Sequence, residues 1–510
     1  MAKRRGRRLV LGVGAVLCAG ALSGCAQQYR SQLVSVNAAG TNSGSGVSDH
    51  QSFSPDGTKI VFDSTSVDLD PKDTNASSDV YLRDLSTGTT RLLSLNAAGT
   101  GPGNRASSRP VFSPDGTKVL FVSSAANLGP PSDSDNVNDL FVRDLTTGTT
   151  SLVSVNSAGT DGGSLASDMP VFSPDSTKVA FRSRAFDLVP NDANATYDIF
   201  VRDLVAGTTE LVTVNQAGTG SGSVDPEKPA AGSLFAPDSQ RVVFVSSADD
   251  LVPDDANGDS DVFLRNLATG TTRQVSTTST GAGGNGAGSF APAISSDGTR
   301  IAFESFSTNL DTTVTDTNDE IDVYVKDLTT DATRLVSVNA AGTAASAGGE
   351  SRAPVFRPGT AQVAFTSAAT GLTASSANGI AQVYLRDLTT GTTTLVTKSS
   401  AGDRGANGPT AGPLFNADGT KLAFNTSAGD LGPKDTNATT DVYVKDLPGG
   451  IISLVSFDTA GDNAGNGASF QPQFQPLGAK IAFLSWASNV AAPDHDTDQD
   501  VFLASVVASG

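Results

Sequence analysis

Short apolar segments alternate with polar, glycine-rich turns along almost the whole chain, and one order of segments returns eight times. In the copy over residues 110–156, four short β-strands are predicted at residues 111–113, 118–123, 139–144 and 151–156, because β-branched and aromatic residues gather there between turn residues. We name these strands A to D. The residues that open the copies lie 59 to 63 positions apart: Phe53, Phe112, Phe172, Phe235, Ile294, Phe356, Phe415 and Phe474.

A repeat of this length indicates units that stack, because one such unit cannot bury its apolar face alone. Radial stacking of four-stranded sheets leaves only short, protected edges, as in a β-propeller. Residues 32–37 match the end of a unit and residues 501–504 match a third strand, so the two ends add up to one unit. We therefore predict an all-β, eight-bladed β-propeller of four-stranded antiparallel blades, with the last blade closed by the N-terminal strand.

The N-terminal segment has the layout of an export signal. Five basic residues precede an apolar run that is too short to span a bilayer as a permanent helix. Leu22-Ser23-Gly24-Cys25 follows and resembles the lipobox of bacterial lipoproteins, in which the leader is cut before a lipidated cysteine. We expect a signal peptide over residues 1–24, a lipidated Cys25 with a short tether over residues 25–31, and the propeller over residues 32–507. A plain secretory signal peptide is the alternative.

This segment predicts a membrane-anchored protein outside the cytoplasm, in a bacterial cell envelope. The only other cysteine, Cys18, lies in the leader, so the mature chain has no pair for a disulfide. The formal net charge is -19, and removal of the basic leader makes the chain more acidic. Such a surface argues against nucleic acid and anionic lipid, and it favours cations and basic partners. We expect a monomer.

The turn sequence S-P-D-G-T-K at residues 54–59 and 113–118, followed by D-V-Y-L-R-D-L at residues 79–85, resembles the Pro-Asp, WD40-like repeat of TolB-type propellers. The resemblance covers residues 32–507 and implies the propeller fold. TolB itself also has an N-terminal α/β domain and six blades, neither of which is found here, so its Pal-binding role is not implied. Propellers include binding modules and enzymes, so the fold alone does not define the function.

The loops between strands B and C hold the sharpest chemical pattern, D-x-N/D-x-x-x-D in seven of eight copies. Oxygen ligands at alternate positions of a tight loop suit a hard cation such as Ca²⁺. Asp259 and Asp498 add a carboxylate to two copies, whereas the sixth copy has Ser376, Asn378 and Gln382 instead. The seven copies are Asp73-Asn75-Asp79, Asp133-Asp135-Asp139, Asp192-Asn194-Asp198, Asp255-Asn257-Asp261, Asp316-Asn318-Asp322, Asp435-Asn437-Asp441 and Asp494-Asp496-Asp500.

Turn chemistry explains the same pattern without metal, because Asp and Asn side chains accept hydrogen bonds from nearby backbone N–H groups. None of the loops has the glycine and distal glutamate of an EF-hand. Both interpretations stay open, and the loops of blades 4 and 8 are the best calcium candidates.

Connectivity puts the short A–B and C–D turns on one face of a propeller and the long B–C and D–A loops on the other. Long loops on a rigid scaffold favour a binding role for that face. His50 and His495, the only histidines, fall in such loops of adjacent blades and are either a transition-metal pair or two solvated side chains. Charged residues near strand A are expected to surround the channel mouth: Arg105, Arg109, Asp168, Glu227, Lys228, Glu350 and Arg352.

Catalytic signals are sparse. The chain has no Gly-x-Ser-x-Gly motif, and Gly281-x-Gly283-x-x-Gly286 lies in a glycine-rich loop with no predicted helix after it. We expect no catalytic residues and a non-enzymatic propeller that binds protein or peptide partners through its long-loop face, with Ca²⁺ ordering those loops. An enzyme acting on polysaccharide or glycan at the channel mouth, and a structural cell-envelope protein, are the alternatives. Few histidines and aromatics favour the first hypothesis over the enzyme.

Overall fold

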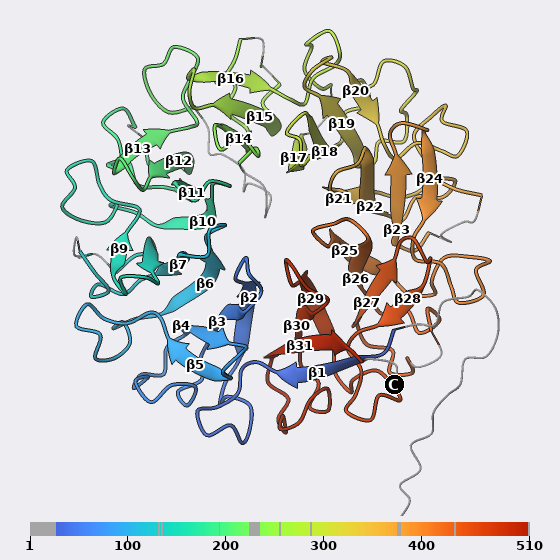
Figure 1. Ribbon diagram of the computed structural model, residues 1–510. Coiled ribbons are helices and arrows are strands. Elements are labelled where there is room, and N and C mark those ends of the chain that lie inside the picture. The colour runs from blue at the N-terminus through green and yellow to red at the C-terminus, as the bar shows by residue number, and fades with distance from the viewer. Residues whose placement is uncertain are drawn as a thin grey trace, which may run out of the picture.

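A computed structural model shows an eight-bladed β-propeller, which confirms the predicted all-β fold (Figure 1). It describes residues 27–507 except residues 131–132, 134–135, 193, 224–234, 254, 256, 286–287, 375–378 and 433–434. Within these residues no helix is found, and hence none with the length and apolar character needed to cross a bilayer. The expected signal segment and Cys25 lie outside the described residues, as do Asp135, Ser376, Asn378, Glu227 and Lys228.

Each blade is an antiparallel sheet whose strands follow one another from the channel outward. The fourth sheet has three strands, and an isolated bridge between Phe235 and Val242 marks the place of its strand A. The strands of blades 1 to 4 are β2 (Ser48–Phe53), β3 (Lys59–Ser64), β4 (Asp79–Asp84), β5 (Thr89–Leu92); β6 (Ser107–Phe112), β7 (Lys118–Ser123), β8 (Asp139–Asp144), β9 (Thr150–Leu152); β10 (Ser167–Phe172), β11 (Lys178–Ser183), β12 (Asp198–Asp203), β13 (Thr208–Leu211); β14 (Arg241–Ser246), β15 (Asp261–Asn266) and β16 (Thr271–Gln274).

Blades 5 to 8 repeat this order, and blade 8 takes its outer strand from the other end of the chain. Their strands are β17 (Ser289–Ile294), β18 (Arg300–Ser305), β19 (Asp322–Asp327), β20 (Thr333–Leu335); β21 (Ser351–Phe356), β22 (Gln362–Ser367), β23 (Gln382–Asp387), β24 (Thr392–Leu395); β25 (Thr410–Phe415), β26 (Lys421–Thr426), β27 (Asp441–Asp446), β28 (Ile452–Leu454); β29 (Ser469–Phe474), β30 (Ile481–Ser485), β31 (Asp500–Val506) and β1 (Tyr29–Leu33).

The N-terminal strand closes the ring, as predicted. β1 pairs antiparallel with β31, from Tyr29 opposite Val506 to Leu33 opposite Phe502, and Figure 1 shows β1 beside β31 in this blade. The strand begins three residues earlier than the predicted residues 32–37 and ends at Leu33, because Ser35 turns its side chain to Asp500 instead of continuing the ladder.

The outer strands are shorter than predicted for a similar reason. In blade 2 the strand expected over residues 151–156 spans Thr150–Leu152. Ser154 then donates its hydroxyl hydrogen to Asp139 at 2.5 Å and accepts a hydrogen bond from the N–H of Leu140, so the chain leaves the sheet edge. A side-chain hydrogen bond that competes with the ladder therefore sets where the strand ends.

The core lies between neighbouring blades. Strand B is buried on both faces, and its phenylalanine stacks on an aromatic ring of strand C in all eight blades, as Phe62 does on Tyr81 with 5.8 Å between ring centroids. Val61 of blade 1 packs in one cluster with Phe112 and Phe121 of blade 2. Each blade therefore buries its apolar faces against the next blade, as the repeat requires.

The loops divide between the two faces as the connectivity predicts. Each D–A loop bonds to the B–C loop of the next blade, as in the 2.8 Å bond from Ala97 N–H to the Asn127 carbonyl. On the opposite face the A–B turns of neighbouring blades meet, as in the 2.7 Å bond from Gln475 to the Gly57 carbonyl. We call the first of these the long-loop face and the second the short-turn face.

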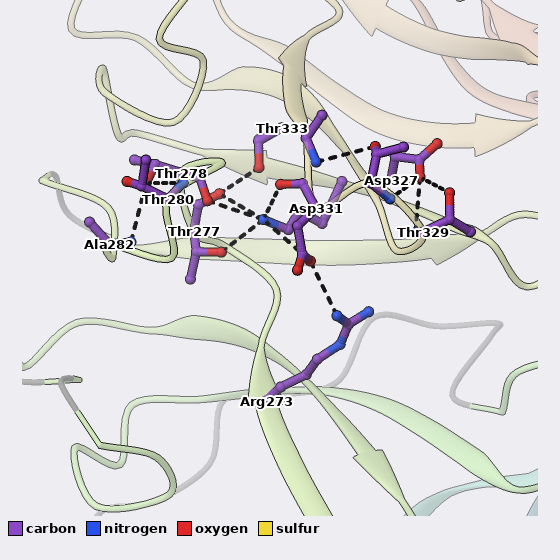
Figure 2. A network of polar contacts seen from close by, with 12 residues as sticks. Arg273, Thr277, Thr278, Thr280, Ala282, Asp327, Thr329, Asp331 and Thr333 are labelled. Carbon is purple, nitrogen blue, oxygen red and sulfur yellow. Dashed lines mark hydrogen bonds and ion pairs between the residues drawn. The ribbon is translucent and has the colours of Figure 1, made fainter.

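Blades 4 and 5 are also tied at their outer edges by a buried lysine. Lys326 of β19 is 2% exposed, and its ammonium donates to Thr277 Oγ1 (3.0 Å), the Thr278 carbonyl (3.2 Å) and the Asp331 carbonyl (2.8 Å). Figure 2 shows the labelled Thr277, Thr278 and Asp331 around these dashed contacts, with Thr333 donating to the Thr277 carbonyl beside them. Burial lowers the pKa of Lys326, so these acceptors are needed to hold its charge.

We expect Lys326→Met to lower the free energy of unfolding by about 2 kcal/mol, because three acceptor oxygens, two of them in buried residues, lose their donor while the apolar stem is kept. Lys445→Met is the matched control: Lys445 has the same strand position in blade 7, but its ammonium has a 3.3 Å bond to one carbonyl, that of Val396. Chemical denaturation of the two variants measures the difference. Equal losses in both would contradict the bridging role of Lys326.

Candidate functional site

The residue that opens strand C, aspartate in seven blades and Gln382 in blade 6, is part of the scaffold. It is buried and accepts a hydrogen bond from a serine or threonine that follows strand D. The pairs are Ser94–Asp79, Ser154–Asp139, Thr213–Asp198, Ser276–Asp261, Ser337–Asp322, Thr397–Gln382, Ser456–Asp441 and Ser35–Asp500. Sequence reasoning missed this pairing, although the recurrent Ser or Thr two residues after strand D was its signal.

Two further side chains donate hydrogen bonds to the carboxylates in blade 7. The Tyr443 hydroxyl donates to Asp435 at 2.9 Å, and the Asn437 amide donates to Asp441 Oδ2 at 2.9 Å. Blade 5 repeats both bonds with Tyr324–Asp316 and Asn318–Asp322, and in blade 1 Tyr81 bonds Asp73, with Asn75 bonding the loop backbone at Ser77 and Gly103. In blades 5 and 7 the hydrogen bonds account for the acidic residues without a metal, as the turn-chemistry interpretation expects, whereas in blade 1 Asp79 Oδ2 has no hydrogen-bond partner in the described part of the chain.

In blade 4 only one of the two buried aspartates has hydrogen-bond donors for both of its carboxylate oxygens. Asn257 donates to Asp261 at 3.0 Å, but Phe263 occupies the place of the tyrosine, and Asp255 Oδ1 has no hydrogen-bond partner in the described part of the chain. Burial raises the pKa of Asp255 to about 7, and the neighbouring Asp261 and Asp249 add to the shift. Asp259 is half-buried, and its own N–H donates to Asn257.

Blade 8 has the one group among the described residues whose carboxylates converge closely enough to hold a metal ion. Oxygens of Asp494, Asp496 and Asp500 all lie within 4.8 Å of one another. Burial, together with the charges of the neighbouring carboxylates, raises the pKa of Asp500 to about 8 and that of Asp494 to about 6. Asp498 and His495 are exposed at the edge of the loop, and the group includes neither histidine.

A β-bulge shapes the long-loop end of strand A in each blade where that strand is described. The bulge places His50, Arg109 and Met169 at positive φ in blades 1 to 3. Left-handed backbone is costly for a residue with a side chain and re-aims that side chain. The bulges therefore determine which side chains stand at the channel mouth.

His50 lies in a polar cluster at this mouth. Its Nδ1 is 2.9 Å from Asp63 Oδ1 and 3.8 Å from Asp49 Oδ2, and the same Asp63 oxygen accepts the N–H of Arg109 at 2.8 Å. The hydrogen bond to Asp63 raises the pKa of His50 more than burial and Arg109 lower it. No described contact joins His50 to His495.

Other predicted charges at the mouth are ion-paired. Arg182 of strand B holds Asp168 through two bonds of 2.8 and 2.7 Å and lies 3.9 Å from the centre of the Tyr197 ring. Arg352 bonds Glu350 at 2.7 Å and Glu304 at 3.3 Å. Arg105 is exposed in a D–A loop. Sequence reasoning missed the strand B partners Asp63, Arg182 and Glu304, whose signal was a charge in an otherwise apolar strand.

Aromatic pairs stand at the same level of the mouth in two blades. Trp486 follows strand B of blade 8, is 50% exposed, and packs edge-on against Phe470 of strand A at 5.2 Å between centroids. Phe306 and Phe290 form the equivalent pair in blade 5 at 5.9 Å. Trp486 therefore both packs and presents an apolar surface to solvent.

No protein-family model matches the chain, and no curated protein matches it. Solved structures that it resembles include an oligogalacturonate lyase from Vibrio parahaemolyticus, with 14% identity, covering 78% of this chain and 89% of that chain at a TM-score of 0.44. An oligogalacturonate lyase in complex with manganese has 13% identity, coverage of 96% and 99%, and a TM-score of 0.43. TolB from Acinetobacter baumannii has 16% identity, coverage of 75% and 77%, and a TM-score of 0.33. These similarities concern the propeller fold, and TolB proteins are among them.

We expect His50 to stabilise the fold in a pH-dependent way. Because its pKa is raised in the folded state, its contribution is full below the ordinary value of about 6.5 and is lost as the pH rises through the raised value. The melting temperature of the wild type should therefore exceed that of His50→Gln by more at pH of about 5.5 than at pH of about 8.5, because the charge-dependent part of the contribution is lost as the pH rises.

An NMR titration identifies the cause directly, because the chain has only two histidines. The isosteric Asp63→Asn variant should lower the pKa of His50, since it removes the charge that stabilises the imidazolium. An unchanged pKa in this variant would show that Asp63 does not control the histidine.

Proposed function

We propose that the protein is a non-enzymatic, lipid-anchored propeller of the bacterial cell envelope, held at the membrane through Cys25, that binds a basic peptide or protein segment at the long-loop mouth of its channel. The supporting observation is Trp486, a half-exposed aromatic side chain fixed by Phe470 beside acidic loops. Rigid aromatic anchors within a polar rim are the usual energetic centres of protein-binding surfaces.

Further exposed apolar side chains accompany Trp486 on the same face. Among the described residues, Val47, Val67, Phe186 and Trp486 are at least 44% exposed and lie in long loops, while Val205 and Leu477 are exposed singly in short turns of two different blades. Val47 and Val67 belong to blade 1, next to blade 8 with Trp486 and Phe470. Exposed apolar side chains in the loops of adjacent blades are available for contact with a partner.

Charge supports a basic partner. The B–C loops carry the acidic pattern described above, and the chain as a whole has a formal net charge of -19. A cationic segment would be steered toward this face and would gain from the loop carboxylates at its rim.

Calcium is the cofactor that we propose for the acidic loops. Carboxylate oxygens are the ligands that Ca²⁺ prefers, and Asp494, Asp496 and Asp500 offer three such groups in one place. A bound ion would hold the B–C loop of blade 8, and with it Trp486, in one arrangement.

A second candidate function is an enzyme acting on polysaccharide or glycan. It is favoured by His50, whose imidazole is paired with Asp63 at 2.9 Å at the channel mouth, an arrangement suited to general acid–base chemistry. Release of reducing sugars from envelope polysaccharide that is lost in His50→Ala would favour this candidate over the binding protein.

The single tryptophan provides a direct test of the proposed binding. Titration with a synthetic peptide rich in Lys, Arg and Leu should change the fluorescence of Trp486, whereas a peptide with Glu in place of the basic residues should not. Trp486→Ala should weaken binding, measured by calorimetry, by about 2 kcal/mol. Leu477→Ala is the control, because Leu477 is 83% exposed on the short-turn face of the same blade. Equal binding by both variants would contradict the proposed site.

A further inference from the structure

The B–C loop of blade 8 lacks both side chains that donate hydrogen bonds to the carboxylates of the corresponding loop in blade 7. Where blade 7 has Tyr443 and Asn437, blade 8 has Phe502 and Asp496. The phenyl ring of Phe502 and the carboxylate of Asp496 have no hydrogen to donate to a hydrogen bond. Three carboxylates therefore gather where blade 7 has two carboxylates and two donors.

Within this group of three acids, one oxygen of Asp500 is left unsatisfied. The residue is completely buried, and its Oδ2 has no hydrogen-bond partner in the described part of the chain. In blade 7 the equivalent oxygen, Oδ2 of Asp441, accepts the amide of Asn437, so Asp500 Oδ2 faces the Asp496 position. A buried carboxylate oxygen without a donor is costly, and the cost is removed by a cation among the three acids.

The ligand set also selects the kind of cation. All three groups offer oxygen, and none offers nitrogen or sulfur, which favours a hard ion over zinc or copper. Two oxygens bound to one Ca²⁺ at about 2.4 Å lie at most about 4.8 Å apart. The carboxylate oxygens of Asp494, Asp496 and Asp500 lie within that limit.

The same acids hold the N-terminal segment. Ser35, just after β1, donates its hydroxyl hydrogen to Asp500 Oδ1 at 2.6 Å, and Ser43 donates to Asp496 Oδ2 at 2.5 Å. Both serines are buried. The acids that converge on one point are thus bonded to residues from the opposite end of the chain.

We propose that a Ca²⁺-type cation binds between Asp494, Asp496 and Asp500 and thereby locks the N-terminal segment onto blade 8. The ion fixes the two carboxylates that Ser35 and Ser43 bind, so closure of the ring depends on the cation. This inference rests on the calcium part of the proposed function and is independent of the peptide-binding part.

The test uses the purified full chain with EDTA, CaCl₂ or MgCl₂, each at about 5 mM. This concentration is high enough to fill weak calcium sites of the extracellular type. Calcium should raise the melting temperature and slow hydrogen exchange of the backbone amides in residues 29–45. Asp496→Asn restores the amide of blade 7, so this variant should be stable in EDTA and should bind Ca²⁺ at least about tenfold more weakly by calorimetry, because one ligand charge is lost.

Asp462→Asn is the matched control, because it removes one charge from an exposed aspartate outside the acidic loops and should keep the full response to calcium. Asp494→Asn, also isosteric, should weaken calcium binding and provides a second variant if Asp496→Asn does not fold. Melting temperatures that calcium raises equally in the wild type, Asp496→Asn and Asp494→Asn would place the ion elsewhere and overturn the site.

Two other results overturn the inference in different ways. A calcium response in melting with no change in exchange over residues 29–45 would overturn the lock on the N-terminal segment. No response to calcium in any variant would overturn both this site and the calcium part of the proposed function. Peptide binding read from Trp486 fluorescence would remain as a separate result in either case.

Discussion

The ring depends on the pairing of β1 with β31, because this contact joins the two ends of the folded chain in one sheet. Ser35 and Asp500 are 465 positions apart, and joining such distant points of a flexible chain costs about 5 kcal/mol beyond a constant. Without β1, the edge of β31 would be open to pairing with another chain. The antiparallel ladder and the buried Ser35–Asp500 bond offset the cost of closure, so the stability of the seam governs the stability of the whole ring.

The repeated bond between strand C and the residue after strand D separates the scaffold from the site. Blade 6 makes this clear: Gln382 accepts from Thr397 with its oxygen, and its amide donates to the carbonyls of Ala406 and Gly408. The Gln382 side chain thus supplies both the acceptor and the donor, so blade 6 forms this turn without an acidic residue. Blade 8 is the opposite case, since Asp496 adds an acceptor where a donor is needed. Equivalent positions therefore support a neutral turn in one blade and the proposed cation site in another.

The fold could be predicted from the sequence because a repeat shows its period directly, and the split unit at the two ends indicates closure. The ends of strand D could not, because Val-Ser-Val continues the alternation of a strand until a distant aspartate captures the serine. The acidic loops look equivalent in sequence, but the hydroxyl of Tyr443 or its replacement by Phe502 decides whether an acid has a donor. The charges Asp63, Arg182 and Glu304 interrupt the apolar pattern of strand B, but they were missed because that pattern does not show that this end of the strand lies at the channel mouth.

The proposed cation and the proposed peptide share one loop. Residues 486–499 connect β30 to β31, so Trp486 stands at the beginning of this loop and the Asp494–Asp500 group at its end. Between them, Ala487, Val490 and Ala491 are buried in the core cluster of blades 7 and 8, which makes the loop a packed connection. A packed connection transmits order from one end to the other at little entropic cost. Because coupling between two ligands is reciprocal, a peptide that fixes Trp486 would raise the affinity for calcium by the same factor as calcium raises the affinity for the peptide.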